Sequence, residues 1–204
     1  MLTIIIIAVI SLVSVIAFSN RTLFHKWLFS PYLINEKHQW HRFFTHMFLH
    51  ADFMHLLFNM FTLFFFGRFV EAVFLRDFGE KGILLYILFF LVSGFCAGVP
   101  AYYKHKENFT YSAVGASGAV SAVLFASILF DPLSKIYIFL IPIGIPAFIF
   151  GPVFLYFSAR MSKKGTDNVA HDTHFWGSVF GFLFPLALNY KYIIVFFEKI
   201  TNAF

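Results

Sequence analysis

The sequence predicts an all-α integral membrane protein, a bundle of six transmembrane helices with a long interfacial loop between the first two. Of its 204 residues, 60% are hydrophobic and only 12% are charged, and the mean hydropathy is +0.79. Soluble domains carry about a quarter charged residues, so this chain lacks the polar surface that a soluble enzyme needs. Its 33 Phe residues and long aliphatic runs also exclude a disordered chain.

Charge excludes a second class of function. The formal net charge is +5, but the 15 Lys and Arg residues are scattered between apolar runs and form no basic stripe. Nucleic-acid binding needs such a stripe, so we expect no nucleic-acid partner and take the lipid bilayer as the environment of the chain.

Six segments are apolar enough to cross a bilayer, which requires about 20 mostly apolar residues with charges between the spans. The first lacks a basic start and a small-residue cleavage site, so we expect a retained span rather than a signal peptide. No linker or internal repeat divides the chain, and we expect a single domain over residues 1–204, with 191–204 as a short C-terminal extension. The expected spans are residues 2–18, 55–75, 82–102, 117–130, 136–158 and 173–190.

The connections between the expected spans are uneven. Loop 1, residues 19–54, is rich in Trp, Phe and His, which favours the membrane interface. Loops 2 and 4 should be short, and the tail should extend the last helix or lie on the membrane surface. Kinks are expected in the fifth span, which contains Pro142, Gly144, Pro146, Gly151 and Pro152.

Polar side chains mark the starts of spans 2, 4 and 6, where each is costly unless it has a partner or a function. They are His55 and Asn59 at i, i+4, Ser117 between glycines, and His171 with His174. Because successive spans alternate in direction, all three starts lie on one side of the membrane. The 14 residues of span 4 rise about 21 Å, so Ser117 should lie below that surface.

Small residues predict which spans touch. Gly118, Ala122 and Ala126 repeat every four residues on span 4, and Gly177 and Gly181 do so on span 6. Small residues let helices approach closely in lipid, so spans 4 and 6 should pack together. This packing would allow a hydrogen bond between Ser117 and His174.

A serine with a histidine base and nearby oxyanion donors is the minimum apparatus for acyl transfer. Ser117 would be the nucleophile and His174 the base, with His55, Asn59 and the Ser117 N–H at the oxyanion. Asp172 falls on another helix face, so a dyad is expected. His171 is interpreted as a solvated loop residue because it is nearer the water. The alternative is that the serine and glycines only pack helices.

The motifs that carry these residues resemble the rhomboid family of intramembrane serine proteases. They are WHRFFTHMFLHADFMH in loop 1, HLLFN and GRFVE on span 2, GASG before span 4, and HFWGSVFG on span 6. The resemblance implies Ser117 as nucleophile, His174 as base, His55 and Asn59 as oxyanion residues, transmembrane proteins as substrates, and no metal or organic cofactor.

Three positions depart from the family pattern. Ser121 stands where an aromatic residue often packs on the catalytic imidazole, Thr173 replaces a usual Ala, and Trp176 replaces a frequent Gly. A non-proteolytic binder of transmembrane helices and a transporter with histidine proton relays are the rival functions. The transporter is disfavoured because spans 2, 4 and 6 lack paired acidic residues.

Nine His residues raise a metal hypothesis, since His46 and His50 are i, i+4 and His171 and His174 are i, i+3. No Cys or HExxH motif accompanies them, so no metal site is expected. His41, His46 and His50 should instead hydrogen-bond to backbone within loop 1. Arg68 and Glu71 on span 2 are expected to be structural, with Arg68 paired locally and Glu71 tying together either the spans or loop 1.

Two signals conflict over orientation. Loops 1, 3 and 5 carry more Lys and Arg than the opposite side, which by the positive-inside rule faces the site to the cytoplasm. The resemblance implies a site on the outer side with cytoplasmic termini, in a bacterial inner membrane. We adopt this orientation because long loops weaken the rule.

Overall fold

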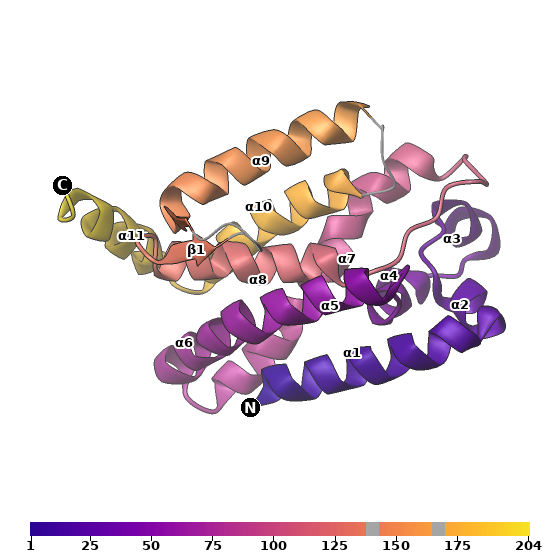
Figure 1. Ribbon diagram of the computed structural model, residues 1–204, viewed down its shortest axis with the longest axis horizontal. Helices are drawn as coiled ribbons and strands as arrows, with labels where there is room; N and C mark the ends of the chain where they lie inside the picture. Colours follow the sequence, from indigo (N-terminus) through magenta and orange to yellow (C-terminus); the bar gives the residue numbers. More distant parts are fainter. Residues whose placement is uncertain (138–142, 165–169) are drawn as a thin grey trace.

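The computed structural model describes residues 1–137, 143–164 and 170–204, and it is mainly a bundle of helices (Figure 1). Loop 1 forms three short helices and a 3₁₀ turn beyond α1. The helices, including one π segment (η2), and the two strands of the described residues are α1 Leu2–Ser19, α2 Arg21–Trp27, α3 Pro31–Lys37, α4 Arg42–Thr45, η1 His46–Phe48, α5 Phe53–Thr62, η2 Leu63–Gly67, α6 Arg68–Phe78, α7 Lys81–His105, α8 Ser117–Phe130, β1 Lys135–Tyr137, β2 Gly144–Pro146, α9 Ala147–Lys164, α10 His171–Leu188 and α11 Lys191–Thr201.

Three helices among the described residues are long and apolar enough to cross a membrane: Leu2–Ser19, Phe53–Phe78 and Lys81–His105. A fourth candidate is the pair α10 and α11, which is bent by 111°. The shorter α8 occupies the same residues as the predicted fourth span. The chain is therefore a helical membrane protein, as the composition predicts.

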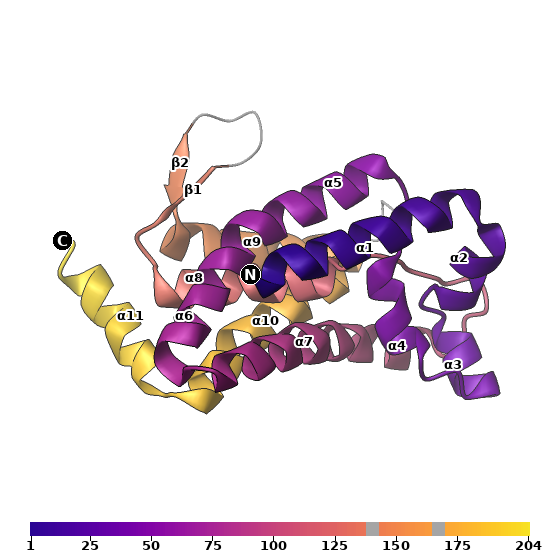
Figure 2. The ribbon, with the colours of Figure 1, turned by 90° about the horizontal axis from the view of Figure 1, so that it is seen from below.

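The fifth predicted span is wrong at its start. Residues 135–137 and 144–146 form strands instead, β1 and β2, which pair antiparallel with Lys135 opposite Pro146 (Figure 2). Gly144 and Pro146 disfavour a helix here and so do not kink one, whereas Gly151 and Pro152 do lie within α9. Loop 4 is consequently long rather than short. Pro142 lies outside the described residues.

Helix α8 is the centre of the bundle, since every residue after Ser117 is buried. It lies against α10 at a distance that only glycine permits: a Cβ at Gly177 would overlap the carbonyl of Gly118, and one at Gly181 would overlap that of Ala122. The predicted packing of spans 4 and 6 is confirmed.

Loop 1 is held together mainly by side chains that bind its own backbone. Buried Arg42 donates to the carbonyls of His25, at 3.0 Å, and Leu28, at 2.6 Å, and its burial lowers its pKa. His41 lies 3.4 Å from the carbonyl of Lys26, as predicted. His50 instead bonds the Ser14 side chain on α1, at 2.9 Å.

The C-terminal helix α11 closes the end of the bundle where α8 finishes. Tyr192 donates to Asp77 of α6 at 2.7 Å, and Lys199 donates to the carbonyl of Phe130 at 2.8 Å. A cation at the carbonyl end of a helix offsets its dipole. The tail therefore turns away from α10 and caps α8.

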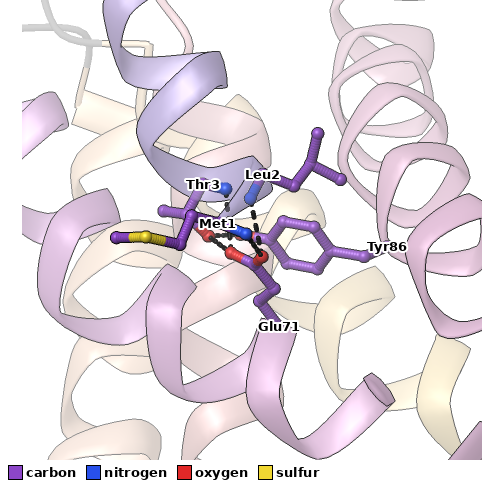
Figure 3. Close-up of polar contacts among 5 residues, drawn as sticks. All are labelled: Met1, Leu2, Thr3, Glu71 and Tyr86. Carbon is purple, nitrogen blue, oxygen red and sulfur yellow. Dashed lines mark hydrogen bonds and ion pairs between the residues drawn. The ribbon is translucent and has the colours of Figure 1, made fainter. Parts of the chain in front are cut away.

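Glu71 ties the start of α1 to α6 (Figure 3). Its carboxylate accepts from the N–H groups of Leu2, at 2.6 Å, and Thr3, at 2.8 Å, and from the Thr3 hydroxyl at 2.6 Å. The Met1 nitrogen lies 3.0 Å away, and Thr3 also bonds the hydroxyl of Tyr86 on α7. Glu71 thus joins three helices, the tie between spans that its position predicts. Arg68 lies over the ring of Phe64, its local partner.

Replacing Glu71 should destabilise the bundle. Glu71→Gln removes the charge that these donors face, and hydrogen bonds to a charged group contribute about 2 kcal/mol each. We expect a lower midpoint of unfolding in detergent, whereas Glu80→Gln, at an exposed position in the next turn, should change little. Equal midpoints for both variants would show that the Glu71 carboxylate does not stabilise the bundle.

Acid should also destabilise the fold through loop 1. Burial lowers the pKa of His46 from 6.5 to about 4, although hydrogen bonds to the backbone of Gly115 and Phe43 partly raise it. Below pH 6.5 the His46 side chain is therefore protonated in the unfolded chain, whereas in the folded chain it stays neutral until about pH 4. The contribution of His46 to the free energy of unfolding is fully present above this pH window, and about 3 kcal/mol of it is lost as the pH falls through the window. The free energy of unfolding, measured from pH 7 to 5, should depend less steeply on pH in His46→Gln; an unchanged slope would contradict this.

Candidate active site

A cavity of about 1130 Å³ lies at the end of the bundle where α5, α8 and α10 begin. Ser117, His174, His55 and Asn59 all line it. The sequence prediction that the starts of spans 2, 4 and 6 meet at one place is therefore confirmed. All four side chains are buried or half-buried.

Gly115 shapes the turn that delivers Ser117 to the cavity. Its φ of +123° lies in a region that favours glycine, and its N–H donates to the carbonyl of His46 at 3.0 Å. A Cβ here would lie 2.8 Å from the His55 ring. Ser117 is the first residue of α8, so the helical ladder leaves its N–H unused. The positive end of the α8 dipole therefore faces the cavity.

The glycine contacts bring Ser117 toward His174. A Cβ at Gly118 would meet the side chains of Ala97, at 2.7 Å, and Thr173, at 2.8 Å, and Gly177 lies on the Gly118 carbonyl. The first turn of α8 therefore lies against residues 173–177 of α10. His174 falls within that stretch, whereas His171 lies one turn nearer the start of the helix.

On the opposite wall, α5 presents two donors. The His55 Nδ1 accepts from the Ala51 N–H at 3.4 Å, which leaves the imidazole proton on Nε2, the nitrogen nearest Gly115. Asn59 donates one amide hydrogen to the carbonyl of His55 at 2.9 Å and keeps its second for the cavity. Both groups can therefore donate to an anion.

His55 packs against His50, which is in turn hydrogen-bonded to Ser14 of α1. The rings of His50 and His55 are 5.0 Å apart and edge to face. The Ser14 hydroxyl donates to the carbonyl of Phe48, so it accepts from Nδ1 of His50. Burial lowers the pKa of His50 to about 3, and neighbouring His55 adds to this shift. A neutral imidazole anchored on α1 therefore packs against His55.

The interpretation of His171 as a solvated loop residue is wrong. It is buried at the first position of α10, with its ring edge-on to Phe157 at 6.1 Å and to His174 at 6.0 Å. The Phe157 ring of α9 contributes to this burial. Asp172 instead bonds Lys104 of α7, at 2.8 Å, on the rim of the cavity.

Sequence reasoning missed Phe154 of α9. Its ring lines the cavity and stacks on that of His174, with centroids 6.4 Å apart and planes at 29°. Ser121, one turn after Ser117, lines the same cavity but offers no ring. No sequence signal identified Phe154, which is one of several aromatic residues in an apolar segment.

The nine His residues do not form a metal cluster in the described part of the chain, where no three His, Cys, Asp or Glu side chains converge suitably. His46 faces the backbone of Gly115 and Phe43, while His50 bonds Ser14. The i, i+4 pair that raised the metal hypothesis thus contacts different neighbours, although the Nε2 atoms of both rings are buried without a hydrogen-bond partner among the described residues.

The fold and cavity define a helical membrane protein with an open cavity, lined in part by polar side chains, among the ends of its helices. The Rhomboid domain model matches residues 37–191, and the chain belongs to the rhomboid family, as its motifs predict. The chain is also similar to RHOMBOID-like protein 12, mitochondrial, of Arabidopsis thaliana, at 26% identity over 155 residues. That alignment covers 68% of this chain and 43% of the relative, so the chain spans less than half of the relative's length.

Proposed function

We propose that this protein is an intramembrane serine endopeptidase that cleaves other transmembrane proteins with a Ser117–His174 dyad. The observation that carries the proposal is the contact of Gly118 with Thr173 and Gly177, which directs the first turn of α8 at residues 173–177. Ser117 and His174 therefore line one cavity beside the donors of α5.

In the proposed reaction, Ser117 Oγ attacks the carbonyl carbon of the scissile peptide while His174 takes the hydroxyl proton. The negative oxygen that forms accepts hydrogen bonds from the Asn59 amide, the His55 Nε2–H and the Ser117 N–H. His174 then gives its proton to the leaving nitrogen, and the C–N bond breaks. Water, activated by the same imidazole, hydrolyses the acyl-enzyme and restores Ser117.

For the membrane arrangement we propose six crossings: α1, the α5–α6 segment, α7, α8, α9 and α10. The site would face the outer side of a bacterial inner membrane, with both termini in the cytoplasm. The folded loop 1 supports this, because a structured loop carries less weight in the positive-inside rule than a short one. Substrate segments with small residues and weak helices should be favoured, because the chain must unwind to present its carbonyl.

Alanine variants should separate the two histidines. Ser117→Ala and His174→Ala should each abolish cleavage of a transmembrane substrate in detergent, and the double variant should be no worse, because dyad members act as a unit. His171→Ala should retain most activity. If His171→Ala is inactive while His174→Ala still cuts, the base is one turn away from the proposed position.

A second substitution tests the oxyanion donor. Asn59→Ala should lower kcat by roughly 10²–10³, as expected for one lost donor, and leave the midpoint of unfolding nearly unchanged. Full activity, or an unfolded variant, would make Asn59 a structural residue. Labelling of Ser117 by a fluorophosphonate separates a protease from a non-proteolytic helix binder, since only an activated serine reacts.

A further inference from the structure

We propose that Phe154 is a positioning residue for the His174 imidazole, so that Ser117 is activated only while α9 is packed against the bundle. This inference rests on the proposed function and concerns the same site. It assigns to α9 a role in the chemistry as well as in forming one wall of the cavity.

The geometry places a nearly parallel ring beside the base. The rings of Phe154 and His174 are nearly parallel, and their centroid separation of 6.4 Å lies within the range of aromatic pairs. Phe154 is itself fixed by other rings: Phe125 of α8 lies at 5.8 Å and Phe150 at 5.7 Å. The imidazole is thus joined through α9 back to α8, the helix that carries the nucleophile.

An imidazole base needs such a support because rotation about its Cβ–Cγ bond is only weakly restricted. On the α8 side of the cavity, the residue one turn after Ser117 is Ser121, whose small side chain cannot cover a ring. The ring of neighbouring His171 contacts the His174 ring edge-on and does not stack on its face. Phe154 supplies the stacked ring.

The support comes from a peripheral helix whose start is held to the end of α8 by the hydrogen bonds of Ala147 and Phe148 to Ser134 and Pro132. Helix α9 follows the β1–β2 hairpin, contains Pro152 two residues before Phe154, and runs beside α10 on the outside of the bundle (Figure 1). Any outward movement of α9 withdraws the ring from His174. The orientation of the His174 ring therefore depends on α9 staying packed against the bundle.

Two assays separate positioning from simple obstruction of substrate entry. Phe154→Leu removes the ring, and we expect the rate of Ser117 labelling by a small fluorophosphonate to fall about tenfold, the value of one aromatic contact. The kcat for a transmembrane substrate should fall similarly, with KM little changed. Phe154→Tyr keeps the ring and should keep both rates.

The matched control is Phe157→Leu, the same substitution one turn along α9 on a ring that contacts His171. It should leave the labelling rate unchanged. Phe154→Met provides a second ringless variant should Phe154→Leu not fold, as judged by its midpoint of unfolding.

Labelling of Phe154→Leu or Phe154→Met at the wild-type rate would overturn the proposal, even if substrate cleavage changed. Equal losses in Phe154→Tyr and Phe154→Leu would overturn it as well, since the ring is then irrelevant. Absence of labelling in the wild type would instead refute the proposed serine protease itself, so the two failures are distinguishable.

Discussion

Glycine contact between α8 and α10 is the constraint on which the site depends. At Gly177 and Gly181 a single added carbon would overlap the backbone of α8, so the two helices meet with no side chain between them at these positions. This closeness directs the start of α8 at residues 173–177 of α10. A serine and a histidine far apart in the sequence thereby line the same cavity, and almost every residue of α8 is buried as a consequence.

Polar ties fix the bundle around that contact, as they must where lipid offers no hydrogen bonds. At one end, Glu71 holds the start of α1, and Lys199 covers the last carbonyls of α8. At the other end, the His46 carbonyl accepts a hydrogen bond from the Gly115 N–H. His50, which is hydrogen-bonded to Ser14, packs against His55. Loop 1 and α1 thus act as a scaffold for the α5 wall of the cavity.

Much of this arrangement is predictable from the sequence. Hydropathy alone gives the positions of five of the six expected spans, and polar residues at three helix starts predict the shared cavity. The strands Lys135–Tyr137 and Gly144–Pro146 escape prediction because apolar residues around Gly144 and Pro146 suit a strand or a span equally well. The burial of His171 and the placing of the Phe154 ring beside His174 depend on how α9 packs against α10, which hydropathy does not show.

The most direct test of the central claim is a crystal structure of the protein after reaction with a fluorophosphonate. A covalent bond from Ser117 Oγ to phosphorus is expected, with a phosphoryl oxygen in hydrogen-bond distance of the Asn59 amide and His55 Nε2, and with His174 as the nearest imidazole to Ser117. An unmodified Ser117, an adduct on another residue, or a phosphoryl oxygen turned away from α5 would contradict the account.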